Sequence, residues 1–279
     1  MFQVKPMQVK DFAFATELAN TMNWNMAVED FAFMTSLEPE GCFVAFEDSD
    51  RVGIATCISF NTVGWFGNLI VEEKYRRKGA GRLLVKHAVN YLQSKGAKTI
   101  GLYAYPNLGS FYGSLGFEKE MDFSVLHAED LGSVAGKTMP KIETKQISTI
   151  EEFDSRCFGG NRKKLLESIL LEKGNLSYYF SRKNEVVGYV AATVYETMAW
   201  VGPLICEVGN VDGAVELLKA VLAKLTGKSV YLALPKNEFA LLDMLFNIGF
   251  TEDFSLARMF LGEATAKNCI YLAESLERG

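Results

Sequence analysis

Apolar and polar positions change their spacing several times along this chain, and each change predicts a boundary between a strand and a helix. Short apolar runs separated by Asp48-Ser49-Asp50 and by Asn61-Thr62 predict strands joined by tight turns. Apolar residues at helical spacing predict helices, and we expect Asp11 to cap the first of them. The elements predicted for the first half are a strand at 2–5, helices at 11–20 and 28–37, strands at 42–46, 52–60 and 63–71, a long helix after 81, a strand at 99–105, a short helix around 112, and two closing strands at 116–119 and 122–127.

A basic turn containing two glycines joins the strand that ends at Val71 to the long helix. The turn reads Arg76-Arg77-Lys78-Gly79-Ala80-Gly81-Arg82. Backbone N–H groups at a helix start have no partner within the helix, the helix dipole adds positive charge there, and glycine allows a ligand to approach closely. The turn therefore predicts a site for a phosphate-bearing anion, most simply a pyrophosphate. It lacks the Gly-Lys-Ser/Thr of a Walker loop, and Leu84 stands where a dinucleotide fingerprint needs its third glycine.

Two motifs together carry a family resemblance. Arg76, Gly79 and Gly81 fit the pattern Arg/Gln-x-x-Gly-x-Gly/Ala, and the segment from Asn107 to Phe117 fits "N…FYxxxGF". In this order, over residues 1 to about 130, they resemble the Gcn5-related N-acetyltransferase (GNAT) superfamily. The resemblance implies an α/β (α+β) fold with a mixed, mostly antiparallel sheet flanked by helices, and acetyl-CoA as co-substrate. It implies cofactor contacts at Leu69, Ile70, Val71, Arg76, Arg77, Lys78, Gly79, Ala80, Gly81, Arg82, Asn107 and Tyr112.

The second half of the chain repeats part of the first. Val52-Gly-Ile-Ala and Gly64-Trp-Phe-Gly-Asn-Leu-Ile recur as Val187-Gly-Tyr-Val and Ala199-Trp-Val-Gly-Pro-Leu-Ile, always at the same offset (187 − 52 = 135 and 199 − 64 = 135). A repeat of this kind indicates a tandem duplication of one fold. We expect an acetyl-CoA-binding domain at 1–130, a linker rich in small residues at 131–140, and a second GNAT-like domain at 141–279.

The second copy is expected to have lost the cofactor site. At the same offset Gly79 faces Ala214 and Gly81 faces Glu216, whose carboxylate would repel a diphosphate, and Leu245 stands in place of Tyr112. The segment Arg258-Met-Phe-Leu-Gly262, together with Trp24-Asn25 in the first half, resembles a group of bacterial and archaeal acetyltransferases with a degenerate C-terminal domain. We expect that domain to shape the acceptor site.

Acetyl transfer to an amine needs a proton donor for the leaving thiolate and a base for the amine. Tyr112 is the candidate donor, because a phenol and a thiol have similar unperturbed pKa values; the alternative is an ordinary packed aromatic residue. Asn107 is expected to cap the helix that carries Tyr112. Glu72 and Glu73 are candidate bases, although exposed acids are common where a strand meets a loop.

Three further residues are candidates for acceptor binding. Trp24 and Asn25 could line an acceptor pocket or form a corner between two helices. His127 ends a predicted strand, where a structural role is the more frequent one.

Composition narrows the remaining choices. The chain has 279 residues with a net charge of −5, so it lacks the basic face expected of a nucleic-acid-binding protein. Its five cysteines are scattered and its two histidines cannot build a histidine-rich metal site, which predicts free thiols and no metal. No apolar run is long enough to span a bilayer. A cytoplasmic protein without membrane contact, monomeric or homodimeric, is the default expectation.

These observations favour an N-acetyltransferase that moves an acetyl group from acetyl-CoA directly to a primary amine, expected to be a small metabolite. No cysteine lies beside a plausible base, which argues against an acetyl-enzyme. A different class fits the same loop: a non-catalytic module that binds or senses acyl-CoA, with the second half as an interaction domain.

Overall fold

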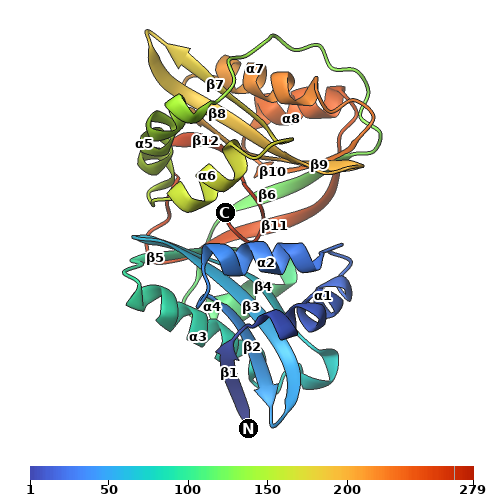
Figure 1. Ribbon diagram of the computed structural model, residues 1–279, viewed down its shortest axis with the longest axis vertical. Coiled ribbons are helices and arrows are strands. Elements are labelled where there is room, and N and C mark those ends of the chain that lie inside the picture. Colours follow the sequence, from blue (N-terminus) through green and yellow to red (C-terminus); the bar gives the residue numbers. More distant parts are fainter. Residues whose placement is uncertain (267) are drawn as a thin grey trace. The chain divides into compact units, whose positions relative to one another are not determined.

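The computed structural model describes residues 1–266 and 268–279. Contacts divide them into two compact units, one made of Met1–Leu102 with residues 261–263 and 278, the other of Tyr103–Phe260 with residues 264–277 and 279. Each unit holds a mixed, mostly antiparallel sheet with helices beside it, so the predicted α/β architecture is confirmed (Figure 1). The predicted domains at 1–130 and 141–279 follow the sequence repeat and stay a prediction, since the contacts place a boundary after Leu102.

The first unit is built on a sheet in which β1, β2, β3 and β4 are antiparallel neighbours and β5 runs parallel to β4. Its strands are β1 (Phe2–Pro6), β2 (Cys42–Glu47), β3 (Asp50–Phe60), β4 (Val63–Val71) and β5 (Thr99–Ala104). Its helices are α1 (Phe12–Asn20), α2 (Val28–Leu37) and α3 (Ala80–Ser94), with short 3₁₀ turns η1 (Val9–Asp11) and η2 (Glu73–Tyr75).

Helices cover both faces of this sheet because side chains alternate between the faces along each strand. Cys42 and Val44 of β2 belong to the apolar cluster that contains α1 and α2. Phe43, between them, lies on the opposite face, where its ring meets His87 and Tyr91 of α3 at centroid distances of 4.7 and 5.7 Å. The parallel connection from β4 to β5 therefore passes through a helix on one face, as such connections require.

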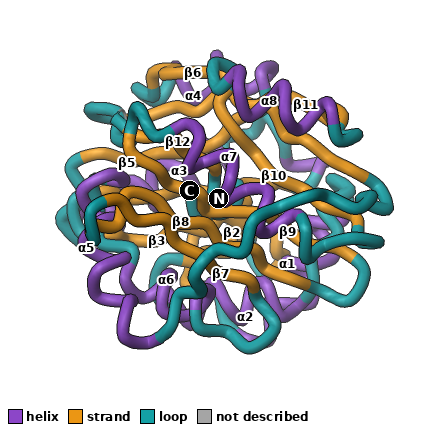
Figure 2. The backbone as a smooth tube through the Cα atoms, turned by 90° about the horizontal axis from the view of Figure 1, so that it is seen from above, coloured by secondary structure: helices purple, strands orange, loops and turns teal. Residues whose placement is uncertain are grey.

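The second unit contains the strand order β11-β6-β10-β9-β8-β7, with β12 paired to β9. Its strands are β6 (Glu118–Ala128), β7 (Leu176–Arg182), β8 (Glu185–Val194), β9 (Met198–Glu207), β10 (Ser229–Pro235), β11 (Thr251–Leu261) and β12 (Cys269–Leu272). Its helices are α4 (Gly109–Gly113), α5 (Ile147–Phe158), α6 (Lys163–Leu170), α7 (Val211–Leu222) and α8 (Phe239–Asn247), with 3₁₀ turns η3 (Pro106–Leu108) and η4 (Thr144–Gln146). Figure 2 marks the helices, strands and loops by colour.

Two helix pairs flank the second sheet. Val190 of β8 packs in the cluster that holds Leu217 of α7 and Leu245 of α8. Tyr189, its neighbour, faces the other way and lies 6.3 Å from the ring of Phe153 in α5. The alternation along β8 thus places α7 and α8 on one face and α5 on the other.

The prediction of two closing strands at 116–119 and 122–127 is wrong, because the segment forms the single strand β6. Strand β6 pairs with β10 on one side and with β11 on the other, so it is held along its length without a turn. The predicted break falls on a β-bulge, where Met121 and Lys119 oppose the consecutive residues Arg258 and Met259 and leave Glu120 unmatched. A bulge bends a strand but does not end it.

The predicted capping role of Asp11 is also wrong. Asp11 lies in η1, one residue ahead of α1, and makes no side-chain cap to that helix. Its buried carboxylate instead accepts hydrogen bonds from the Gln8 N–H at 3.0 Å and from Arg51 Nε at 2.7 Å. The side chain therefore ties the turn after β1 to β3.

The segment between β6 and η4 runs along α7. Residues 131–140, predicted as a linker, contain no helix or strand, and an isolated bridge follows at Lys141. Gly136 passes so close to the Lys219 carbonyl oxygen that a Cβ would lie only 2.5 Å from it. Lys137 forms an ion pair with Glu216 at 3.2 Å. The segment is thus packed against the second unit.

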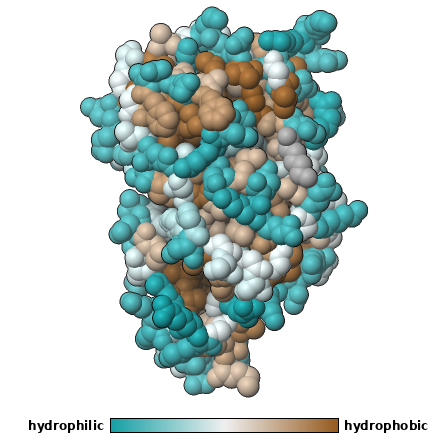
Figure 3. All heavy atoms as spheres, turned by 180° about the vertical axis from the view of Figure 1, so that it is seen from behind, coloured by the Kyte–Doolittle hydropathy of each residue, from teal (hydrophilic) through white to brown (hydrophobic). Residues whose placement is uncertain are grey.

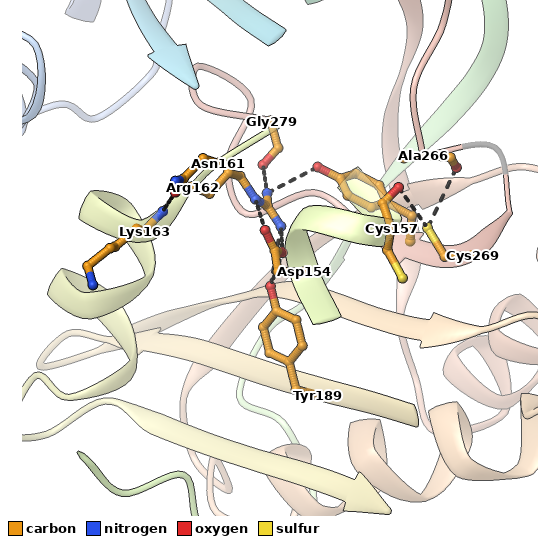
Figure 4. A network of polar contacts seen from close by, with 10 residues as sticks. Asp154, Cys157, Asn161, Arg162, Lys163, Tyr189, Ala266, Cys269 and Gly279 are labelled. Atoms are coloured by element: carbon orange, nitrogen blue, oxygen red, sulfur yellow. Dashed lines mark hydrogen bonds and ion pairs between the residues drawn. The ribbon is translucent and has the colours of Figure 1, made fainter. Parts of the chain in front are cut away.

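A buried ion pair organises the α5–α6 side of the second unit (Figure 4). Arg162 Nη2 and Nε donate to the two carboxylate oxygens of Asp154 at 2.6 and 3.1 Å, and neither side chain is exposed. Arg162 Nη1 also donates to the Gly279 carbonyl at 3.1 Å and to the Tyr271 hydroxyl at 3.4 Å, while the Tyr189 hydroxyl donates to Asp154 at 2.5 Å. Both charged side chains of the ion pair have several partners, which is the condition under which a buried ion pair is tolerated.

Polar residues surround scattered apolar ones on the face seen in Figure 3. The large apolar side chains that are exposed include Val208, which is 68% exposed, and Phe239 at the start of α8, which is 70% exposed. Within the described residues, no helix combines the length and the apolarity needed to cross a bilayer.

We predict that Arg162→Met lowers the free energy of unfolding by about 3–5 kcal/mol, because it leaves the buried Asp154 carboxylate without its counter-charge. Urea denaturation followed by circular dichroism measures the change. Lys163→Met is the matched control: its ammonium is exposed, so the expected change is within about 0.5 kcal/mol. The double variant Arg162→Met/Asp154→Leu should recover part of the loss. Equal stability of the two single variants would contradict the role assigned to the pair.

Candidate functional site

A β-bulge at Asn68 and Leu69 deforms β4 near its C-terminal end. Ile70 pairs with Ile54 and Gly67 with Thr56, so Asn68 and Leu69 together oppose the single residue Ala55. Asn68 adopts a left-handed φ of 48°, which asparagine tolerates better than most residues. Its buried side-chain amide donates to Thr56 Oγ1 at 3.2 Å. Bulges of this kind redirect the backbone of a strand.

Strands β4 and β5 part immediately before this bulge. Among the described residues, their parallel ladder runs from Val63–Thr99 to Phe66–Leu102, whereas β4 continues to Val71. The last residues of β4 therefore keep β3 on one side and have no ladder partner in β5 on the other. The two strands therefore part after Phe66 and Leu102.

Backbone groups of Val71 face the open side of β4. The Glu72 N–H donates to the Val52 carbonyl at 2.9 Å, so Glu72 points toward β3. Because adjacent strand residues direct their backbone groups to opposite sides, Val71 points away from β3. Arg76 Nε confirms this direction, since it donates to the Val71 carbonyl oxygen at 2.8 Å. The same alternation directs the N–H groups of Leu69 and Val71 to the open edge, while the Ile70 side chain packs with α1 and α2.

The turn after β4 is shaped by local geometry. Residues Glu73–Tyr75 form η2, and Arg76 folds back onto the end of β4. Arg77 has a left-handed φ of 61°, and Lys78 places its ammonium 5.5 Å from the centroid of the Tyr75 ring. Gly79 follows with a φ of 102°, a conformation that favours glycine. A Cβ at Gly79 would meet nothing within 4 Å, so the backbone angle alone explains the glycine.

Helix α3 presents its N-terminus to this turn. The Leu83 N–H donates to the Gly79 carbonyl at 3.0 Å, so the N–H groups of Ala80 and Gly81 precede the first intrahelical bond. Ala80 is buried, Gly81 is half-buried, and Arg82 is exposed. The exposed side chains of Arg76, Arg77 and Lys78 place positive charge beside the start of α3, which supplies backbone N–H donors. This arrangement suits a diphosphate.

The two candidate bases differ in their surroundings. The Glu72 carboxylate lies 3.2 Å from Lys74 Nζ, and this hydrogen bond and charge raise the pKa of the lysine. Glu73 is exposed at the start of η2. Glu72 is therefore partly neutralised, whereas Glu73 faces solvent.

Tyr112 lies in α4 of the second unit, and it is 5% exposed. Its ring meets Phe111 and Phe117 edge-on at centroid distances of 5.0 and 5.9 Å. Burial raises the pKa of the Tyr112 phenol. The pKa of the phenol is therefore not close to that of a thiol, contrary to the prediction from the unperturbed values. The phenol keeps its proton and can act as a hydrogen-bond donor. The basic turn belongs to the first unit, so joint action of the turn and Tyr112 stays a prediction.

The predicted capping role of Asn107 is wrong. Asn107 lies within η3, and Leu108 occupies the N-cap position of α4. Pro106 opens this 3₁₀ turn and displaces the start of the helix by two residues beyond Asn107. Asn107 is exposed, which leaves its predicted cofactor contact open as a prediction.

The loop between α1 and α2 carries the first two acceptor candidates. Trp24 is half-buried against the cluster formed with α1 and α2, and Asn25 is exposed with a φ of 49°. Asn20 closes this loop, donating to the Met26 carbonyl at 2.9 Å and accepting from the Met26 N–H at 2.8 Å. Arg76 Nη2 lies 3.9 Å from Met22 Sδ, which brings the loop beside the basic turn within the first unit.

His127 lies on β6 in the second unit. Its ring stacks on Tyr231 of β10, with centroids 4.1 Å apart and planes 8° apart, and its Nε2 is 3.7 Å from Glu129. These contacts explain His127 as a residue that joins two strands, and its predicted role in acceptor binding stays a prediction.

The equivalent turn of the second unit is shortened. Only residues 208–210 connect β9 to α7, whereas residues 72–79 connect β4 to α3. The ungapped comparison of Gly81 with Glu216 is therefore wrong: Glu216 lies in the second turn of α7 and pairs with Lys137. The second copy therefore has no room for a turn of the length found between β4 and α3.

The open edge is also absent from the second copy. Strand β10 pairs with β9 only from Met198 to Trp200, so these two strands part as β5 and β4 do. Beyond that point β12 pairs with β9 from Leu204 to Glu207, and the Ala273 N–H donates to the Ala233 carbonyl of β10 at 3.0 Å. The chain therefore fills this gap with its own strand.

No group of three or more metal-ligating side chains occurs within residues 1–266 and 268–279. The basic turn and the start of α3 are groups of the kind that suit a phosphate-bearing ligand, and the open edge of β4 lies beside them.

Comparison with known proteins agrees with this geometry. Family models described as "Acetyltransferase (GNAT) family" and "Acetyltransferase (GNAT) domain" match residues 11–117 and 150–271. A curated relative, serotonin N-acetyltransferase 2 of rice chloroplasts, is 38% identical over 63 residues, which are 23% of this chain and 30% of the relative. The chain thus spans less than a third of that relative's length.

Solved structures share the fold over nearly the whole chain. A putative acetyltransferase from Pyrococcus horikoshii is 20% identical with a TM-score of 0.80, covering 100% of this chain and 96% of its own. A GCN5-related N-acetyltransferase from Sphaerobacter thermophilus is 13% identical with a TM-score of 0.68, covering 95% and 98%. A tandem GNAT protein from the clavulanic acid biosynthesis pathway is 14% identical with a TM-score of 0.63, covering 95% and 99%.

One family model therefore matches each half of the chain, and the full-length neighbours include a tandem protein. The chain belongs to the Gcn5-related N-acetyltransferase superfamily and carries its fold twice, with the basic turn present only in the first copy.

Proposed function

We propose that this protein is an acetyl-CoA-dependent N-acetyltransferase that transfers an acetyl group directly to the primary amine of a small metabolite. One observation carries the proposal: the open edge of β4 and the cationic start of α3 are joined by a single turn within one unit. A ligand with a diphosphate at one end and a thioester at the other matches both features.

The residues of the turn fit the diphosphate of acetyl-CoA. Gly79 adopts the left-handed φ that the turn requires, and the N–H groups of Ala80 and Gly81 supply hydrogen-bond donors. Arg77, Lys78 and Arg82 add exposed positive charge. Arg76 already donates one nitrogen to Val71, so it orders the turn as well as contributing charge.

The exposed edge of β4 would hold the thioester. The N–H groups of Leu69 and Val71 point to this edge and can donate to the acetyl carbonyl oxygen, where negative charge develops during transfer. Tyr112, whose phenol stays protonated, would donate a hydrogen bond to the leaving sulfur. Glu73 is the better-placed base of the two candidates, because Lys74 occupies Glu72.

Direct transfer is favoured by the state of the cysteines. Burial raises the pKa of Cys42 and of Cys206 to about 12, and it raises the pKa of Cys57 well above its usual value. Such thiols are poor nucleophiles at neutral pH. An acetyl-cysteine intermediate at these residues is therefore disfavoured.

A small amine acceptor is supported by the relatives. The curated relative is named as a serotonin N-acetyltransferase, and a structural neighbour with a TM-score of 0.66 and 15% identity is described as a glucosamine N-acetyltransferase region. Both names describe acetylation of an amine on a small molecule.

Gly79→Asp is predicted to weaken acetyl-CoA binding at least about tenfold, since it places a carboxylate beside the diphosphate. Isothermal titration calorimetry measures the affinity. Gly79→Asn, of the same size but neutral, should lose clearly less. Gly96→Asp is the matched control, because Gly96 has a similar φ of 98° at the other end of α3 and also has open space around it. An equal loss in Gly79→Asp and Gly96→Asp would rule out a specific effect of charge at the turn.

Tyr112→Phe is predicted to reduce kcat about tenfold or more while leaving acetyl-CoA affinity within about twofold, because the hydroxyl acts on the leaving sulfur. Steady-state release of CoA with a panel of amines measures kcat. Tyr178→Phe removes another buried hydroxyl of the second unit and should leave kcat unchanged. Binding of acetyl-CoA without turnover of any amine by the unaltered protein would favour the non-catalytic sensing module instead.

A further inference from the structure

Two cysteines of the second unit meet at the end of β12 that lies next to α5. Cys157 lies in the last turn of α5, and Cys269 is the first residue of β12. The Cys269 side chain reaches the C-terminal end of α5, where Cys157 lies. Cys269 Sγ also lies 4.0 Å from the Cys157 carbonyl oxygen and 3.7 Å from the Ala266 carbonyl oxygen, as Figure 4 shows. All of these atoms belong to one unit.

The two thiols have unequal surroundings. Cys157 is half-buried, whereas Cys269 is only 8% exposed. Interaction with the Cys269 thiol lowers the pKa of Cys157, and the charge of Arg156 adds to this effect. Burial and the charges of Asp154 and Glu207 oppose the shift without reversing it. Interaction with Cys157 and burial raise the pKa of Cys269, although Arg258 and Arg162 act in the opposite direction. One thiol is accessible and more acidic, and its neighbour is buried and protonated.

We propose that Cys157 and Cys269 form a thiol pair that reacts with hydroperoxides and closes to a disulfide. An accessible, acidic cysteine beside a second cysteine is the arrangement in which a first oxidation product is resolved at once. The proposal concerns the second copy of the fold, so it does not depend on acetyl transfer.

The reaction balances in two steps. The Cys157 thiolate attacks the distal oxygen of a hydroperoxide, which forms the S–O bond, breaks the O–O bond and releases an alcohol or water that takes up a proton. Cys157 is thereby oxidised to a sulfenic acid and the peroxide is reduced. The Cys269 sulfur then attacks the Cys157 sulfur, the S–S bond forms, and the hydroxyl leaves as water with the Cys269 proton. The sulfurs must come within about 2.05 Å of each other, a movement that rotation of the half-buried Cys157 side chain can supply.

A disulfide at this position would link the start of β12 covalently to the end of α5. The bond would lie beside the point where Tyr271 of β12 meets Arg162. Strand β12 fills the gap between β9 and β10, so the link would hold closed the place that is open in the first copy. Because the cross-link joins residues far apart in the sequence, it should also stabilise the folded second unit.

The chain offers matched internal controls. Cys42 and Cys57 are neighbours on β2 and β3, but both are fully buried and burial raises the pKa of each. Cys206 lies on β9 next to β12, but its Sγ is turned toward the Asn210 carbonyl at 3.4 Å, within the cluster that packs on α7. These three thiols should stay reduced when the pair closes.

Mass spectrometry after a short exposure of the reduced, full-length protein to hydrogen peroxide tests the proposal. The expected product is lighter by two hydrogen atoms, and peptide mapping should find the cross-link between Cys157 and Cys269. Oxidation should proceed at least about tenfold faster than at Cys42 or Cys57. The oxidised protein should melt at a temperature higher by about 5 °C or more.

Variants separate the two steps. Cys269→Ser should stop at a sulfenic acid on Cys157 that dimedone captures, whereas Cys157→Ser should neither cross-link nor react with dimedone. Cys206→Ser should cross-link as the unaltered protein does. The proposal is overturned if peroxide oxidises Cys42 or Cys57 as fast as Cys157, if a different pair cross-links, or if the unaltered protein accumulates Cys157 sulfinic acid without a disulfide. All three of these outcomes are measured on the unaltered protein, so they do not depend on the folding of a variant.

Discussion

The parting of β4 from β5 is the constraint on which the first unit depends. Among the described residues, β4 keeps only β3 as a ladder partner beyond Phe66, and the bulge at Asn68 redirects its backbone there. An unpaired strand edge must find hydrogen-bond partners in water, in a side chain or in a ligand. Arg76 supplies one partner by reaching back to Val71, and the remaining groups face the place where a thioester would lie. The left-handed turn at Gly79 then brings the start of α3, with its charge, to the same side.

The second unit meets the same constraint in a different way. Its β9 and β10 also part, but β12 lies in the gap and pairs with the backbone of β9. The turn that would bind a diphosphate is cut to residues 208–210, and Glu216 serves as the ion-pair partner of Lys137. The buried pair of Arg162 and Asp154 then fixes the segment that follows β12 through Gly279. One copy of the fold thus has an open strand edge beside a basic turn, and the other fills the equivalent gap with its own strand.

Sequence patterns predicted most of the elements, because apolar spacing reports which face of an element is buried. Helix α2 and strand β4 have the predicted bounds, and the repeat predicted the shared fold. The failures have local causes. The pattern around Glu120 resembled a break because a bulge interrupts alternation, and only the partners of β6 on both sides show a continuous strand. Asn20 and Asn68 escaped notice because their roles depend on backbone angles and on distant partners, which spacing does not encode. The shortened second turn was hidden because an ungapped comparison cannot reveal a difference in length.

The central claim is that one copy of the fold binds acetyl-CoA and the other does not. The most direct measurement is the stoichiometry of acetyl-CoA binding to the full chain by isothermal titration calorimetry at a protein concentration well above the dissociation constant. The account predicts one molecule bound per chain, with an affinity that falls at least about tenfold in Gly79→Asp. Two molecules per chain would show that the second copy binds the cofactor despite β12, and no binding at all would contradict the assignment of the basic turn.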